Sequence, residues 1–166
     1  KVKSNTPVQI TMWNYYNGAQ KEEMDRLVQE FNDTVGLEQK IVVESVSKGS
    51  VSELEDAVRD STDGKTGSDP LPDFCSAYAD AAYDLWKKDK ISDFRPYLTD
   101  EEYDSYISGY LEEGNFGTNA AMMIFPVAKS TEVLTLNSTA WEPFARETGA
   151  SLENLSTWEG LAQTAK

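Results

Sequence analysis

The sequence contains no histidine and only one cysteine in 166 residues. Without histidine it lacks the commonest general base and the commonest transition-metal ligand, which excludes histidine-based triads and most zinc sites. A single cysteine also excludes an internal disulfide and any cysteine cluster for zinc or iron–sulfur. Cys75 falls inside an apolar stretch, where we expect a small buried residue rather than a reactive thiol. Catalysis would have to depend on carboxylates or lysines, and no cofactor is expected.

Positive charge is also scarce, because 15 Lys and Arg stand against 29 Asp and Glu, giving a formal net charge of −14. Such a chain is repelled by phosphate backbones and anionic lipid, so binding to nucleic acid or to acidic membranes is excluded as a main activity. No apolar run approaches the length of a transmembrane helix. We therefore expect a small-molecule partner and no nucleic acid.

What the sequence does contain is an ordinary globular composition, with 39% hydrophobic and 11% aromatic residues. Apolar, β-rich runs predict four strands, at 8–13, 41–46, 74–77 and 120–126. The segments between them have apolar residues at helical spacing or capping signals. The pattern therefore alternates strand and helix.

The predicted helices have recognisable ends. The first is expected to end at Gly36, and the second to begin at a capping box of Ser50 and Glu53. Thr99 with Glu102 predicts a later capped helix. Its apolar face would carry Tyr103, Tyr106, Ile107, Tyr110 and Leu111.

This alternation predicts an α/β fold with a three-layer, mainly parallel sheet. Right-handed crossovers place the carboxyl ends of parallel strands on one edge, and ligands bind in the crevice outside that edge. Four loops would meet there, at 13–18, 47–50, 76–80 and 126–130.

The last of these loops interrupts the pattern. The fourth strand stops at Pro126, and a second alternating segment, 131–137, follows without a helix between them. Such a strand cannot return through a helix to its own sheet, so we interpret 128–131 as an interdomain crossover. A further capped helix is expected to begin with Thr139 and Glu142 and to end at Gly149, and Thr157 is placed to cap a last helix.

Five motifs in register resemble a known family. They are an opening strand that ends in Trp13, an EFN run (30–32), an LPD run (71–73), a P-x-x-x-S-T-x-x-L-x-x-N run (126–137) and a T-W-E-x-L run (157–161). Together they resemble the extracellular solute-binding proteins of ABC importers, most closely the family-1 group that takes up sugars and glycerol phosphates. One departure is that Thr135 and Leu136 stand where many relatives have an aromatic pair.

The resemblance implies a protein with two lobes, each like a type II periplasmic-binding-protein lobe, that closes on a small solute. Residues 1–128 would form most of the N-terminal lobe and 129–166 the crossover strand and the start of the second lobe, so the chain would be a truncated part of a longer protein. The solute would be a sugar or oligosaccharide, delivered to the transmembrane subunits of an ABC permease. The resemblance further implies a bacterial monomer that is extracellular, either a membrane-anchored lipoprotein or periplasmic.

Aromatic residues at the end of the first strand are the first candidate ligand contacts. Trp13, Tyr15 and Tyr16 could stack on sugar rings, because an aromatic face buries apolar C–H surface and leaves the hydroxyls free. The alternative is that Trp13 belongs to the core and the tyrosines merely cover the loop.

The loop after the second strand offers a different chemistry. Lys48, Gly49 and Ser50 lead into a helix N-terminus, whose free N–H groups suit an anion or a hydroxyl. Alternatively, Ser50 only caps the helix and Lys48 is solvated, while a phosphorylated solute remains an open possibility.

The remaining candidates follow the third and fourth strands. Tyr78 and Asp80 could bind vicinal hydroxyls, although Asp80 could instead be the N-cap of a helix starting at Ala81. Lys129 and Ser130 are either ligand contacts or part of the hinge.

The sequence leaves two other functions open. A carbohydrate-active enzyme could use carboxylates such as Asp80, although the lack of histidine argues against it. A surface scaffold or adhesion module could keep the fold without a solute. A non-catalytic receptor for a small polar solute is the leading hypothesis.

Overall fold

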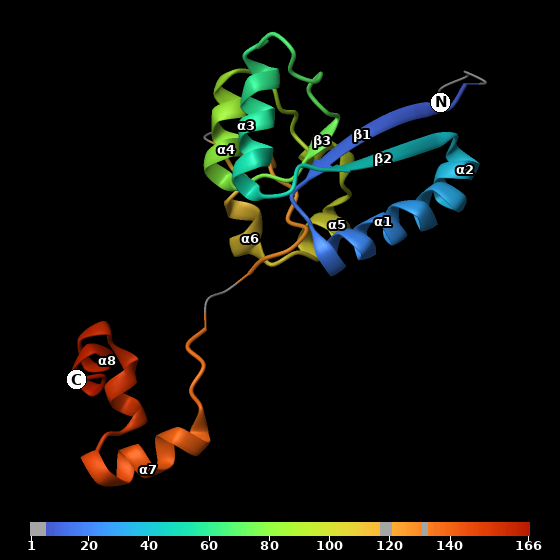
Figure 1. Ribbon diagram of the computed structural model, residues 1–166. Helices are drawn as coiled ribbons and strands as arrows, with labels where there is room; N and C mark the ends of the chain where they lie inside the picture. Colours follow the sequence, from blue (N-terminus) through green and yellow to red (C-terminus); the bar gives the residue numbers. More distant parts are fainter. Residues whose placement is uncertain (1–5, 117–120, 131–132) are drawn as a thin grey trace. The chain divides into compact units, whose positions relative to one another are not determined.

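The computed structural model describes residues 6–116, 121–130 and 133–166, in two units, Lys1–Val127 and Ala128–Lys166 (Figure 1). The described elements of the first unit are β1 (Val8–Asn14), α1 (Gly18–Asp33), α2 (Val35–Gln39), β2 (Ile41–Ser47), α3 (Val51–Thr62), β3 (Phe74–Cys75), α4 (Ala79–Lys87), the 3-10 helix η1 (Arg95–Tyr97), α5 (Asp100–Asp104) and α6 (Ser108–Glu112). Those of the second are α7 (Ser138–Thr148), the 3-10 helix η2 (Leu152–Ser156) and α8 (Trp158–Thr164). None of these described helices is both long and apolar enough to cross a membrane.

The sheet of the first unit has the order β2-β1-β3, and both pairs are parallel. Val8 lies opposite Ile41, and Met12 lies opposite Phe74. The third strand is shorter than the sequence predicts, since it ends at Cys75. The α/β class and the parallel sheet are confirmed, and the carboxyl ends of the strands share one edge.

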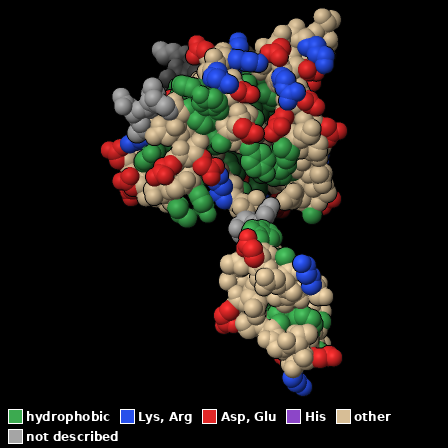
Figure 2. Space-filling view, turned by 90° about the vertical axis from the view of Figure 1, so that its left-hand side faces the viewer, with side chains coloured by type: hydrophobic (Ala, Val, Ile, Leu, Met, Phe, Trp, Pro, Cys, Tyr) green, Lys and Arg blue, Asp and Glu red, His purple; other side chains and the backbone are tan. Residues whose placement is uncertain are grey.

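Helices cover the sheet in layers. Figure 1 shows α1 and α2 running along β2, while α3 and α4 lie together on the other side of the sheet. The buried core on that side consists of Trp13 from β1, Leu54 and Val58 from α3, and Leu85 from α4. On the face seen in Figure 2, hydrophobic side chains stay visible among charged ones.

Two side chains extend the hydrogen bonding of the sheet. The Asn32 amide donates to the Val43 carbonyl (2.9 Å) and accepts from the Val43 N–H (2.8 Å), so it pairs with the backbone of β2 as a neighbouring strand would. The Thr11 N–H donates to Asp73 Oδ2 (2.8 Å), just before β3 begins to pair with β1. Asn32 and Asp73 belong to the EFN and LPD motifs, which therefore have a structural role.

The first helix ends earlier than predicted. It stops at Asp33, a break occurs at Thr34, and Gly36 lies inside the short helix α2. Gly36 is buried, and a Cβ there would lie 2.6 Å from the Ile41 carbonyl oxygen, so close packing rather than helix capping requires glycine. Lys40, with φ of 58°, makes the left-handed turn into β2.

The prediction of one helix after Thr99 is wrong. The capping box of Thr99 and Glu102 is present and starts α5, but that helix ends at Asp104. A second helix, α6, follows with Ile107 as its N-cap, and Ile107 is exposed. The tyrosines pack separately: Tyr106 meets Phe125 edge to face, and Arg95 lies over the Tyr103 ring.

The predicted fourth strand is not formed in the described residues 121–126. Met122 is nonetheless fully buried, and its N–H donates to Asp93 Oδ1 (2.8 Å) while its carbonyl accepts from the Phe94 N–H (2.9 Å). The Met123 N–H donates to the Gly114 carbonyl (2.8 Å). Loop groups thus satisfy the backbone that a strand neighbour would have paired, and Ala120 itself lies outside the described residues.

The second unit is helical where it is described. The expected crossover strand is not formed at 133–137, and residues 131 and 132 lie outside the described residues. Asn137, rather than Thr139, caps α7, because its side chain accepts from the Thr139 and Ala140 N–H groups. The predicted end at Gly149 is confirmed by its left-handed φ of 75°. Thr157 caps α8 as predicted.

Candidate functional site

Three tyrosines gather at the carboxyl edge of the sheet. The Tyr15 and Tyr16 ring centroids are 5.1 Å apart, and the Tyr78 ring, which follows β3, stacks on Tyr15 at 6.5 Å with an interplanar angle of 16°. Tyr15 and Tyr16 are half-buried, whereas 51% of Tyr78 is exposed. The fold thus unites side chains more than sixty positions apart into one partly exposed aromatic surface.

Burial is the main cause that raises the pKa of Tyr15, and the neighbouring Tyr78 phenol adds to the shift. A raised pKa keeps the phenol protonated at neutral pH. The Tyr15 hydroxyl therefore remains able to donate and to accept hydrogen bonds.

A buried polar residue holds the first edge loop in place. Asn14, at the end of β1, is 2% exposed. Its amide nitrogen donates to Ser45 Oγ (2.9 Å), and its Oδ1 accepts from the Tyr16 N–H (3.1 Å). Its own carbonyl accepts from the Lys48 N–H (2.8 Å). The bond to Tyr16 ties the loop after β1 to its own strand, and the other two bonds join the end of β1 to β2 and to the loop that follows β2.

The loop after β2 completes this connection. Ser47 Oγ donates to the Tyr16 carbonyl (2.5 Å) and accepts from the Gly49 N–H (3.2 Å), while the Asn17 amide donates to the Gly49 carbonyl (3.0 Å). We call the side chains of Asn14, Ser47 and Asn17 the polar clasp. The polar clasp joins the first two edge loops into one unit.

The structure places Trp13 in the core, with 3% of its surface exposed. Lys48 covers its ring, with the ammonium 3.8 Å from the ring centroid and 3.1 Å from Asp69 Oδ2. Only 17% of the Lys48 side chain is exposed, so it is engaged rather than simply solvated. The charge of Lys48 is thus already balanced by Asp69 and the Trp13 ring.

Ser50 and Asp80 occupy helix starts. Ser50 caps α3, because its Oγ accepts from the Glu53 N–H (3.2 Å) and donates to Glu53 Oε2 (2.7 Å). Helix α4 begins at Ala79 with Tyr78 as N-cap, so the alternative in which Asp80 is the N-cap is wrong. Asp80 lies in the first turn, exposed, with Oδ1 accepting from the Ala81 N–H (2.9 Å).

The other predicted contacts, Lys129 and Ser130, are exposed residues of the second unit. Within the first unit, the structure therefore brings together Tyr15, Tyr16 and Tyr78, with Gly49 joined to them through the polar clasp. Sequence reasoning missed Asn14 and Asn17. A polar residue directly after an apolar strand is the signal that could have identified Asn14.

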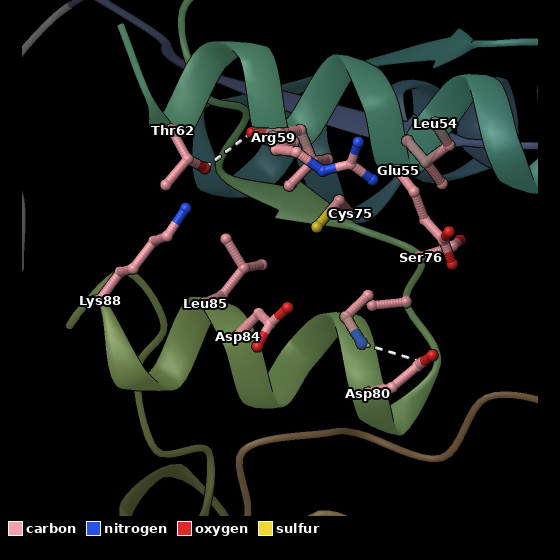
Figure 3. A pocket seen from close by; sticks show the side chains of 13 residues that line it. Leu54, Glu55, Arg59, Thr62, Cys75, Ser76, Asp80, Asp84, Leu85 and Lys88 are labelled. Atoms are coloured by element: carbon pink, nitrogen blue, oxygen red, sulfur yellow. Dashed lines mark hydrogen bonds between the residues drawn. The ribbon is translucent and has the colours of Figure 1, made fainter.

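A groove of about 220 Å³ also opens between α3 and α4 (Figure 3). Leu54, Val58, Leu85 and Cys75 form its apolar floor, and Asp80 lies at one end. Burial raises the pKa of the Cys75 thiol. Among the described residues, no group of three or more acidic or cysteine side chains is placed to hold a metal ion.

Comparison with known proteins shows the fold. No family model and no curated protein matches the sequence. The structure of the Thermus thermophilus maltotriose binding protein bound with maltotriose matches with a TM-score of 0.52 and 18% identity, over 69% of this chain and 28% of that one. CpMnBP1 with mannotriose bound matches with a TM-score of 0.49 and 18% identity, over 66% and 26%.

The chain thus spans less than a third of the length of either solved structure. Its mixed α/β fold with a parallel sheet is similar to that of part of the maltotriose binding protein.

Proposed function

We propose that this chain is part of the substrate-binding component of an ABC transporter of the family-1 type, which binds a sugar or oligosaccharide and delivers it to a membrane permease. The observation that carries the proposal is the cluster of Tyr15, Tyr16 and Tyr78 at the carboxyl edge of the parallel sheet. Open α/β sheets bind their ligands at this edge. The fold likeness to a maltotriose binding protein supports the same proposal.

The chemistry of the edge suits an uncharged sugar. The partly exposed Tyr78 ring offers an apolar face for the C–H groups of a pyranose, and tyrosine hydroxyls bond to sugar hydroxyls. Lys48 is engaged with Asp69 and Trp13, which favours a neutral solute over a phosphorylated one. The protein acts as a receptor without turnover.

The proposal includes the organisation of the whole protein. Residues 1–128 supply most of one lobe, 129–166 begin a second, and solute is held when the two lobes of the complete protein close. The monomeric protein works outside the cytoplasmic membrane, as a lipoprotein or in the periplasm, where the transmembrane subunits of the permease recognise the closed form.

Isothermal titration of the complete protein tests the proposal. Maltotriose, mannotriose, other neutral saccharides and glycerol 3-phosphate serve as ligands, and product release is followed in parallel. We expect saturable binding of a neutral saccharide, without turnover, and roughly tenfold weaker binding in Tyr78→Ala. The control Tyr97→Ala, an exposed tyrosine in η1, should bind normally. Product formation, or no heat with any solute, would contradict the proposal.

A further inference from the structure

The backbone of Tyr16 is held from both sides by side chains. Its N–H donates to Asn14 Oδ1 (3.1 Å), and its carbonyl accepts from Ser47 Oγ (2.5 Å). Asn14 belongs to β1 and Ser47 to β2, so this short segment is fixed to two neighbouring strands of the sheet. The segment carries Tyr15 and Tyr16, whose rings pack on each other.

The polar atoms that make these bonds are already engaged in hydrogen bonds within the protein. Asn14 is 2% exposed, with its oxygen on Tyr16 and its nitrogen on Ser45. Ser47 Oγ already donates to the Tyr16 carbonyl and accepts from Gly49. Neither side chain is free to bind a solute, and removing either one would leave backbone groups of Tyr16 without their partner.

We propose that Asn14 and Ser47 are positioning residues of the solute site, which fix Tyr15 and Tyr16 in the binding geometry without touching the solute. The inference rests on the proposed function. A loop that is ordered before binding loses less conformational entropy when the ligand arrives, so the polar clasp raises affinity by pre-organisation. It also makes the first two edge loops move as one body, because Asn17 bonds the Gly49 carbonyl.

The test compares four variants. Ser47→Ala and Asn14→Leu remove the bonds to Tyr16, and Ser47→Thr restores a hydroxyl at the same position. Ser45→Ala is the matched control, since it removes the other partner of Asn14 but leaves both bonds to Tyr16 in place. Each variant is titrated with the saccharide that binds the wild type, and NMR cross-peaks between the rings of Tyr15 and Tyr16 and of Tyr15 and Tyr78 report the aromatic geometry without ligand.

We expect Ser47→Ala and Asn14→Leu to bind about tenfold more weakly and to lose or weaken the ring cross-peaks. Ser47→Thr should recover the wild-type affinity and the ring cross-peaks. Ser45→Ala should keep the affinity and the cross-peaks even if it unfolds at a lower temperature. Unchanged cross-peaks in a folded Ser47→Ala would overturn the inference, whatever the solute. If the wild type bound no saccharide, the proposed function would fail, yet the cross-peaks would still decide whether the polar clasp positions the tyrosines.

Discussion

Side chains, rather than strands, complete part of the hydrogen bonding of the sheet. Asn32 satisfies both backbone groups of Val43 in β2, and Asp73 accepts the Thr11 N–H of β1. A backbone group that loses its partner inside a protein costs more than the net value of an average hydrogen bond. Asn32, whose bonds to Val43 are partly buried, should therefore contribute more to stability than an average surface residue.

Asn32→Ala should lower the free energy of unfolding by about 1–3 kcal/mol, because the Val43 N–H and carbonyl lose their partner together. Chemical denaturation measures the change. Gln29→Ala is a matched control on the same helix, because this exposed side chain bonds to Asp33 of its own helix, and the variant should stay within about 0.5 kcal/mol of the wild type. Equal losses of unfolding free energy in the two variants would show that the hydrogen bonds to Val43 contribute no more than the exposed bond of Gln29.

Cys75 should react slowly with thiol reagents. Burial raises the pKa of its thiol, so at pH 8 a smaller fraction is thiolate than in a free cysteine, and the thiolate is the reacting form. We expect alkylation by iodoacetamide several-fold slower than that of a free cysteine at pH 8, and a normal rate after unfolding in guanidinium. A native rate equal to the denatured rate would mean that the groove between α3 and α4 leaves the thiol open.

At the scale of single residues, the candidate site was only partly predictable from the sequence. Tyr15, Tyr16 and Tyr78 could be placed at one edge because the carboxyl ends of parallel strands coincide. The burial of Trp13 and the engagement of Lys48 with Asp69 depend on where the loop at 63–73 folds back, which no local pattern encodes. The same holds for Asn14, whose partners lie on the neighbouring strand and in the next loop.

Among the elements, helix α3 has the clearest local signal. Ser50 caps it through the Glu53 N–H, and α3 contributes Leu54 and Val58 to the core. Ser50→Ala should therefore lower stability by about 1 kcal/mol, measured by thermal or chemical unfolding. Ser50→Asp preserves a capping oxygen and should keep most of the stability.

The same pair of variants separates the two interpretations of Ser50. If Ser50 only caps α3, solute affinity in Ser50→Asp stays near that of the wild type. A stable Ser50→Asp that has lost affinity would instead identify Ser50 as a solute contact.

Elements with local signals were predicted well, and those decided by distant partners were not. The strands β1 and β2 and the starts of α3, α5 and α8 follow from apolar runs and capping residues. The segment at 121–126 looks like a strand by composition, but Asp93, Phe94 and Gly114 take its backbone groups. Tertiary contacts also divide the predicted helix after Thr99, since Tyr106 turns toward Phe125.

At the scale of the whole molecule, the net charge of −14 is the dominant electrostatic feature. The ion pairs of Lys21 with Asp25 and of Arg26 with Glu30 are exposed pairs within α1. Such pairs contribute little and are screened by salt, while the excess negative charge repels itself throughout the compact state. The destabilisation from this net repulsion should therefore exceed the stabilisation from the surface ion pairs.

Thermal stability should therefore rise with ionic strength. We expect the midpoint of unfolding at pH 7 to increase between about 10 mM and 200 mM NaCl, because the Debye length shortens from roughly 30 Å to below 10 Å. Choline chloride at the same ionic strength should act alike, which distinguishes screening from specific sodium binding. A midpoint that falls with either salt would show that the local pairs outweigh the net repulsion.

The position of Asn32 has a practical consequence for producing the protein. Asn32, Asp33 and Thr34 form an acceptor sequence for N-glycosylation. In a eukaryotic secretory host, a glycan would be attached to the same amide nitrogen that donates to the Val43 carbonyl, and its bulk would press against β2. Bacterial expression, or Thr34→Val in a secretory host, avoids this modification and leaves the Asn32 amide in place.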